Sequence, residues 1–347
     1  MEDSKNVIVS QLTERESKAL YVLKAFSIFS VITAHVNIIL KSNIFSNLMT
    51  AFWNLFGTIG VFCFFLLGGF FYRREEKDSG KYWKKKFFTL ILPWLLCATL
   101  TYAIAVLSTR QISALGYLKW VLGSGSLYYY VPVFLIFLLI FKYFYKHNWC
   151  LIICIVVNLA SLLIYAFDID YCSAIPFLTK YLNPLNWIGF FALGILVRKY
   201  RWDRIIIKNW WIFCIAAVSL IALFIVMWKF NIDSYFHIVT PFWACVSYIL
   251  LLGLAYLMAD YKIAIPFVSM GRWSYGVYLL HMQIVQFIIS RFPINTIFVT
   301  VNPIFCFVLM YVLMLILVTV ILLIPKGEKL LLLIGINDKK KVKKEAK

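Results

Sequence analysis

LKAFSIFSVITAH, residues 23–35, is the stretch that decides the fold, because it places a lysine and a histidine inside an apolar run of membrane-spanning length. Lys24 and His35 are eleven residues apart. At about 100° per residue, both side chains therefore leave one face of a helix, about 16 Å apart along its axis. An ionisable group near the centre of a bilayer costs roughly 2.5–3.5 kcal/mol on insertion scales, so it usually faces a protein interior or a wet cavity. This helix face predicts a functional path.

The composition predicts an all-α integral membrane protein. Hydrophobic residues make up 63% of the 347 residues, charged residues make up 14%, and the mean hydropathy is +0.87. A soluble core cannot bury so much apolar surface. We expect about ten transmembrane helices in one bundle, since most of ten apolar runs reach the roughly 17–25 residues that a bilayer requires. These runs are residues 19–41, 48–72, 87–107, 126–144, 149–166, 184–197, 209–228, 236–257, 273–290 and 300–324.

The sixth run, residues 184–197, differs from the others. It is short and contains Gly189 and Gly194. We expect it to be tilted, re-entrant or continued by the polar residues around it.

Lysine and arginine fall mainly in alternate loops, which predicts that both termini are cytoplasmic. With the N-terminus inside, the inner segments hold 27 of the 34 cations, the outer loops hold 6, and Lys24 lies in the membrane. The same asymmetry accounts for the net charge of +19 through topology and anionic lipid, without nucleic acid as a partner.

The chain reads as one membrane domain with two short polar flanks. We expect a cytoplasmic N-terminal segment at 1–18, the membrane domain at 19–324 and a basic cytoplasmic tail at 325–347. The first apolar run is full length, so no cleavable signal peptide is expected. Seven of the eight cysteines lie in or at the ends of apolar runs, and neither a disulfide framework nor a metal-ligand spacing emerges.

Six motifs follow one another along these runs, beginning with the lysine–histidine stretch itself. The others are GVFCFFLLGGFFYRR at 60–74, KYWKKKFFTLILPW at 81–94, LYYYVPVFLIF at 127–137, NPLNWIGFFALG at 183–194 and GRWSYGVYLLH at 271–281. In this order, they resemble the signatures of the membrane-bound acyltransferase family 3, and the resemblance covers nearly the whole chain.

The resemblance implies a multi-pass O-acyltransferase of the bacterial inner membrane. Such an enzyme moves an acyl group, often acetyl, from acyl-CoA to a hydroxyl of a cell-envelope glycan or its lipid-linked precursor. It also implies that the first-span histidine, His35, is the catalytic residue. The sequence departs from the pattern at Lys24, where arginine is more usual, at Gly68, which replaces a serine, and at Thr89, which leaves a basic pair incomplete. These departures leave open poor donor binding or another acyl group.

The donor, acetyl-CoA or another acyl-CoA, has a polyphosphate head and a long arm that carries the thioester. Several cations together hold phosphates. We expect Lys24 to meet the arm or a phosphate inside the span. The inner-face cations expected to hold the head are Arg73, Arg74, Lys84, Lys85 and Lys86.

His35 fits two catalytic roles. As a general base, it takes a proton from the acceptor hydroxyl while that oxygen attacks the thioester. As a nucleophile, it carries the acyl group briefly. We prefer the base, because it needs one step and no deacylation site. A developing oxyanion also needs donors, and the candidates within the last motif are Ser274, Tyr275, Tyr278 and His281.

Structural interpretations compete with these roles. Lys24 could snorkel to the inner headgroups, the inner cations could serve topology alone, and His281 could simply join its helix to a neighbour. A second function class is an exporter or flippase for a polysaccharide or a small metabolite. Such a carrier more readily has inverted repeats or paired interrupted helices, which the sequence does not reveal.

Overall fold

The computed structural model describes residues 12–36, 44–72, 79–124, 126–167, 169–232, 235–291 and 302–337, and the regular elements in these ranges are all helices. The α-helices are α1 (Glu14–Val36), α2 (Ile44–Phe70), α3 (Ser79–Lys86), α4 (Leu92–Thr109), α5 (Ala114–Leu122), α6 (Tyr130–Phe144), α7 (Asn148–Tyr165), α8 (Ile188–Tyr200), α9 (Trp202–Lys208), α10 (Trp210–Lys229), α11 (Thr240–Met258), α12 (Ala264–Arg291), α14 (Asn302–Leu323) and α15 (Gly327–Leu333). A π-helical turn, η1 (Phe87–Ile91), joins α3 to α4, and two 3-10 turns, η2 (Tyr171–Ala174) and η3 (Pro184–Asn186), precede α8. The predicted all-α fold class is confirmed.

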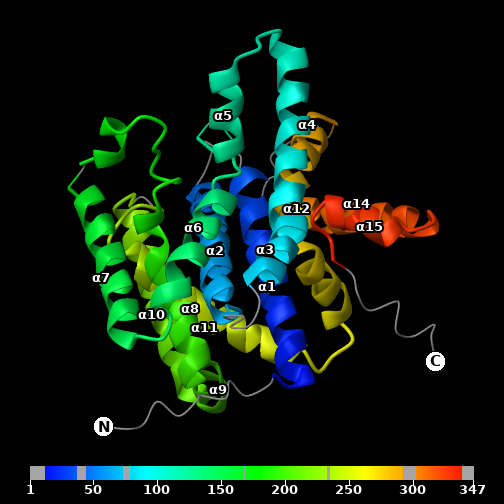
Figure 1. The fold of residues 1–347 in the computed structure, drawn as a ribbon. Helices are drawn as coiled ribbons and strands as arrows, with labels where there is room; N and C mark the ends of the chain where they lie inside the picture. The colour runs from blue at the N-terminus through cyan, green and yellow to red at the C-terminus, as the bar shows by residue number, and fades with distance from the viewer. Residues whose placement is uncertain are drawn as a thin grey trace.

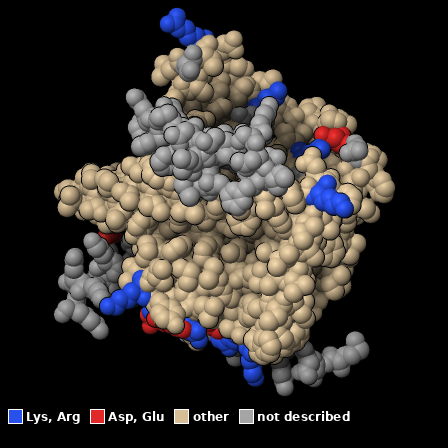
Figure 2. Space-filling model, turned by 180° about the vertical axis from the view of Figure 1, so that it is seen from behind, with Lys and Arg blue, Asp and Glu red and all other residues tan. Residues whose placement is uncertain are grey.

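Seven described stretches are long and apolar enough to cross a membrane, so the chain is a multi-pass membrane protein. They are Glu14–Val36, Leu48–Phe70, Gly80–Leu107, Asn148–Tyr165, Trp210–Lys229, Thr240–Met258 and Pro303–Leu323. The remaining predicted runs form α6, which is shorter at 15 residues, and α8 and α12. Figure 2 shows a broad face with few charged side chains between edges where they gather. The count of ten spans and the side of the termini stay predictions.

The sixth run is continued by the polar residues that follow it. A 3-10 turn at Pro184–Asn186 leads into α8, which extends through Arg198 and Lys199 to Tyr200. The helix is nevertheless only 13 residues long.

Helix α1 lies in the middle of the bundle, where it packs mainly against α12 and α2 (Figure 1). Small residues permit these close contacts. A Cβ atom at Gly271 of α12 would lie 1.9 Å from the carbonyl oxygen of Tyr21 on α1. Gly69 of α2 meets the Phe191 carbonyl of α8 equally closely, as expected for helices that associate through small side chains.

Helix α1 begins earlier than the sequence predicted, inside the expected polar segment 1–18. The reason is a capping box, in which an N-terminal Thr and a Glu three residues later satisfy each other's backbone N–H. The Thr13 N–H donates to Glu16 Oε2 at 2.8 Å, and the Glu16 N–H donates to Thr13 Oγ1 at 3.1 Å.

The expected basic tail, 325–347, is partly folded, so its predicted start is too early. Helix α15 (Gly327–Leu333) lies within it, and the segment after α15 packs onto α12. Ile336 is fully buried, and a Cβ atom at Gly276 of α12 would lie 2.6 Å from its Cγ1 atom. The apolar run LLLLIGI, residues 330–336, explains this packing, since burying it removes apolar surface from water.

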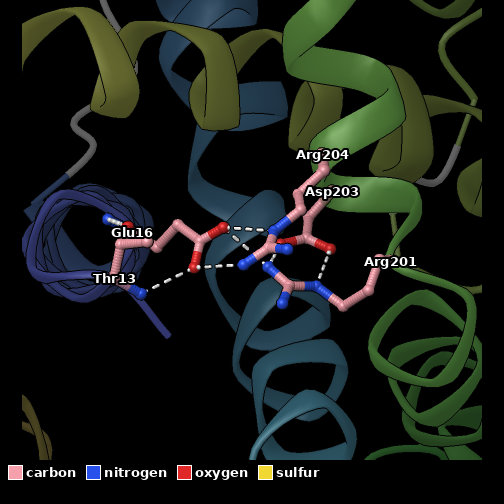
Figure 3. A network of polar contacts seen from close by, with 5 residues as sticks. All are labelled: Thr13, Glu16, Arg201, Asp203 and Arg204. Atoms are coloured by element: carbon pink, nitrogen blue, oxygen red, sulfur yellow. Dashed lines mark hydrogen bonds and ion pairs between the residues drawn. The ribbon is translucent and has the colours of Figure 1, made fainter. Parts of the chain in front are cut away.

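An ion network, the α1–α9 clasp of Glu16, Arg201, Asp203 and Arg204, joins the start of α1 to α9 (Figure 3). Arg201 Nη2 lies 2.7 Å from Glu16 Oε1 and 3.0 Å from Asp203 Oδ2. Arg204 Nε donates to Glu16 Oε1 at 2.6 Å, and this hydrogen bond raises the pKa of Arg204 above the ordinary arginine value. Glu16 therefore holds two guanidinium groups at one end of the bundle.

Gly68, the position where the family signature has serine, is filled from the neighbouring helix. A Cβ atom there would lie 2.6 Å from Cε2 of Phe134 on α6 and 3.2 Å from Cε2 of Phe191 on α8. The Phe134 ring also stacks on Tyr130, with centroids 5.5 Å apart. The glycine and the phenylalanine therefore form one packing unit.

Replacing Glu16 with Ala leaves two arginines without their shared carboxylate. We expect a loss of about 3 kcal/mol in unfolding free energy, as for other buried ion pairs that lose one partner. Thermal unfolding of the detergent-solubilised protein measures this loss. Arg204→Ala is the matched control and should cost less, since its side chain is 44% exposed against 7% for Glu16. Equal stability of Glu16→Ala and wild type would contradict the role of the clasp.

Gly68→Ser should destabilise the bundle because its side chain collides with the Phe134 ring. We expect about 1–3 kcal/mol, the usual cost of an overpacked core. Phe134→Leu removes the colliding atoms, so the double variant should be more stable than the sum of the single effects predicts. Thermal unfolding of all four proteins in detergent measures this coupling. Strict additivity would show that the two positions do not share the space.

Candidate active site

His35 lines a cavity of about 890 Å³ that lies where α1 ends. We call this the outer cavity. Its wall combines aromatic rings with amide and hydroxyl groups, among them Trp120, Tyr129, Tyr181, Tyr235, Gln283 and Gln286. The Gln283 Oε1 atom is buried and has no hydrogen-bond partner among the described residues. An imidazole, flat rings and a free amide acceptor thus share one space.

A second histidine faces the same cavity. His281 of α12 is 2% exposed, and its ring centroid lies 5.2 Å from that of His35. The Nδ1 atom of His281 is 2.6 Å from the carbonyl oxygen of Tyr278, one turn earlier on the same helix. The first and last motifs of the sequence therefore bring their histidines together.

A smaller cavity of about 400 Å³, the middle cavity, lies next to the outer one. Val31, Val61 and Tyr278 line both cavities, so these side chains mark the junction. His35 follows Val31 by one turn of α1, and His281 follows Tyr278 by about one turn of α12. Both imidazoles therefore stand just beyond the junction.

The inner cavity, of about 520 Å³, opens at the end of the bundle where α1 begins. It shares Lys24, Lys86, Thr89 and Ser274 with the middle cavity, so the three spaces form one series. Its lining is rich in cations. These are Lys18, Lys24, Lys86 and Arg272, against one carboxylate, Glu14.

Aromatic rings flank three of these cations. Lys24 Nζ lies 4.5 Å from the ring centroid of Phe71, and Lys86 Nζ lies 5.5 Å from that of Tyr82. The Arg272 guanidinium carbon is 5.5 Å from the ring centroid of Tyr21. A ring face attracts a cation without neutralising it, so the positive charge remains available to an anion.

A π-helical turn shapes the wall shared by the inner and middle cavities. Pro93 lacks an N–H and its ring would meet the carbonyl of Thr89, so the regular α-helical bond cannot form there. The chain instead forms η1 (Phe87–Ile91), which places Thr89 and Leu90 in the lining. The Tyr275 hydroxyl donates to the Leu90 carbonyl at 2.5 Å and so ties this turn to α12.

Two tyrosines join the segment before α6 to α12 beside the outer cavity. Tyr278 Oη donates to the Leu127 carbonyl at 2.6 Å, and Tyr128 Oη donates to the Leu279 carbonyl at 3.1 Å. These reciprocal bonds fix the position of the His281 helix against the fourth motif.

The structure gathers most of the predicted site residues around these cavities. Lys24 and His35 face connected cavities, which confirms that the two side chains share one face of α1. The others in the linings are Lys85, Lys86, Ser274, Tyr275, Tyr278 and His281. Lys84 is exposed and lines none of the three cavities. Arg73 and Arg74 lie outside the described residues.

The sequence analysis did not select Arg272, Tyr21 or Tyr82 as site residues. Arg272 is the second residue of GRWSYGVYLLH and lies three turns before His281, so the helical spacing that links Lys24 to His35 recurs approximately between these two. That repeat on a second helix was the available signal. The two aromatic residues carry no pattern that separates them from interfacial anchors.

Comparison with known proteins agrees with this arrangement. No curated protein and no solved structure matches the chain. A family model described as an acyltransferase domain, that of acyltransferase family 3, matches residues 17–323, which include all three cavities except the wall supplied by Glu14, Gly335 and Asn337. The chain therefore belongs to acyltransferase family 3.

Proposed function

We propose that the protein is a membrane O-acyltransferase that moves an acetyl or similar acyl group from acyl-CoA to a hydroxyl of a cell-envelope glycan or its lipid-linked precursor. The bacterial inner membrane is the location that fits this role. The observation that carries the proposal is the series of cavities that runs from a group of cations to a pair of histidines. The family match favours acyl transfer over polysaccharide export, which is the competing function.

The series of cavities matches the two parts of an acyl-CoA donor. The cations of the inner cavity suit the phosphates, because ammonium and guanidinium groups bind phosphate oxygens by charge-assisted hydrogen bonds. The pantetheine arm is long and thin, and it fits the middle cavity that leads from Lys24 to the junction. Lys24 and His35 are separated by about 16 Å along α1, a distance that only an extended arm covers.

The outer cavity suits a sugar acceptor. Aromatic rings stack on the apolar faces of sugar rings, and side-chain amides such as those of Gln283 and Gln286 hydrogen-bond to hydroxyl groups. The unpartnered Gln283 Oε1 atom offers an acceptor for such a hydroxyl. Donor and acceptor would then meet beside His35 from opposite sides of the junction.

In the proposed reaction, His35 takes the proton of the acceptor hydroxyl as its oxygen attacks the thioester carbon. The carbon–sulfur bond then breaks, and the thiolate receives the proton. General base catalysis by a positioned histidine is typically worth about 10²–10⁴ in rate. The nucleophilic alternative passes through an acylated His35 and differs only in that intermediate.

His35→Ala should lower acyl transfer by about 10²–10⁴-fold, since it removes the base. Membranes from cells that express each variant are given labelled acetyl-CoA, and the label in the lipid and glycan fractions is measured. His147→Ala is the control, because His147 is exposed and lines none of the three cavities. Full transfer by His35→Ala at normal protein levels would refute the catalytic assignment.

Lys86→Gln and Arg272→Gln should each weaken acyl-CoA binding by about tenfold, because each removes one charge-assisted contact to phosphate. Isothermal titration of the purified protein in detergent with acetyl-CoA measures the dissociation constant. Lys84→Gln is the matched control on the same helix as Lys86, and its side chain lies outside the cavities. An equal loss for Lys84→Gln, or no loss for the other two, would mean that these cations serve topology only.

A further inference from the structure

The outer cavity holds an imidazole that the proposed reaction has not yet used. His281 comes from α12 and His35 from α1, and their ring centroids are 5.2 Å apart at an interplanar angle of 41°. Because each follows a junction residue by about one turn, the two rings stand at the same depth. That depth is where a thioester leaving the middle cavity would first meet an acceptor.

One nitrogen of His281 is fixed by its own helix. The Nδ1 atom lies 2.6 Å from the Tyr278 carbonyl oxygen, which can only accept a hydrogen bond, so Nδ1 carries a proton. In the neutral ring, Nε2 is then an acceptor. This atom is buried and has no hydrogen-bond partner in the part of the chain that the structure describes.

An acceptor left unpaired in the interior costs roughly 1–3 kcal/mol, so its retention needs a reason. The neighbouring group that could satisfy Nε2 is the ring N–H of His35. At this centroid separation, turning the His35 ring edge toward His281 brings a nitrogen of each ring within hydrogen-bond reach.

We propose that His281 is a positioning residue for His35, and this inference rests on the proposed function. Its Nε2 atom accepts the N–H of one His35 nitrogen, which leaves the other His35 nitrogen unprotonated and aimed at the acceptor hydroxyl. The order is then Tyr278 carbonyl, His281, His35 and substrate alcohol. It follows the arrangement in which a third group orients a catalytic base.

The proton and electron balance needs no additional reagent. The alcohol O–H bond breaks, its proton moves to the free nitrogen of His35, and the oxygen forms a bond to the thioester carbon. When the C–S bond breaks, its electron pair stays on sulfur, and the His35 imidazolium gives the proton to that thiolate. His281 keeps its own proton throughout, and its hydrogen bond strengthens while His35 is charged.

Two substitutions separate this role from a structural one. In His281→Gln, the side-chain oxygen takes the place of Nε2 as an acceptor but the bond to the Tyr278 carbonyl is lost. In His281→Asn, the amide N–H replaces Nδ1–H and keeps that bond but no acceptor reaches His35. His281→Leu keeps the volume and provides neither group.

The experiment compares kcat and KM for labelled acetyl-CoA among these variants in membranes, with protein amount and thermal stability measured in parallel. We expect His281→Asn and His281→Leu to lose roughly 10–100-fold in kcat, the effect of removing an orienting partner, with little change in KM. His281→Gln should retain most of the kcat. Adding His281→Leu to His35→Ala should lower the residual rate no further, because His281 acts through His35.

The outcomes that overturn the proposal are distinct from those that overturn the function. If His281→Asn is as active as wild type while His281→Gln is impaired, the histidine only joins its side chain to its helix. If all three variants keep the wild-type kcat, His281 does not position the base. In either case a transfer-deficient His35→Ala leaves the proposed function intact, whereas full activity of His35→Ala refutes the function's catalytic base itself.

Discussion

The scarcity of water inside a bilayer is the constraint on which the rest of the structure depends. A polar group in the hydrocarbon region must find a partner or a wet cavity, and α1 carries two ionisable side chains that need such surroundings. The bundle meets this need by placing α1 in its middle and by surrounding Lys24 with aromatic rings and His35 with a cavity wall. The close contacts at Gly271 and Gly69 then bring the other helices near enough to form those walls.

The sequence was sufficient for the features that depend on local periodicity and composition. The spacing of Lys24 and His35 placed both on one helix face, and the apolar runs located the long helices. The six motifs identified the family, which the match over residues 17–323 confirms. Gly69 was expected to permit a close helix approach, and its contact with Phe191 agrees.

Features that depend on contacts between distant segments could not be read in this way. The start of α1 was placed too late, although Thr13 and Glu16 carry a recognisable capping box, because the charge of this segment was read as a loop signal. The role of Arg272 beside Tyr21 and the exclusion of Lys84 from the cavities follow from how α12 and α3 face α1. The distance between His35 and His281 is set by the packing of α1 on α12, about which the spacing within either helix contains no information.

The wall of the inner cavity joins the two ends of the described chain, since Glu14 and Asn337 both line it. During biosynthesis, the helices enter the membrane one after another from the N-terminus. The cation-lined chamber therefore lacks one side until the ribosome has added Asn337 and the segment around Ile336 has settled against Gly276. A nascent or prematurely terminated polypeptide would have both histidines in place, yet its inner chamber would stay open on that side.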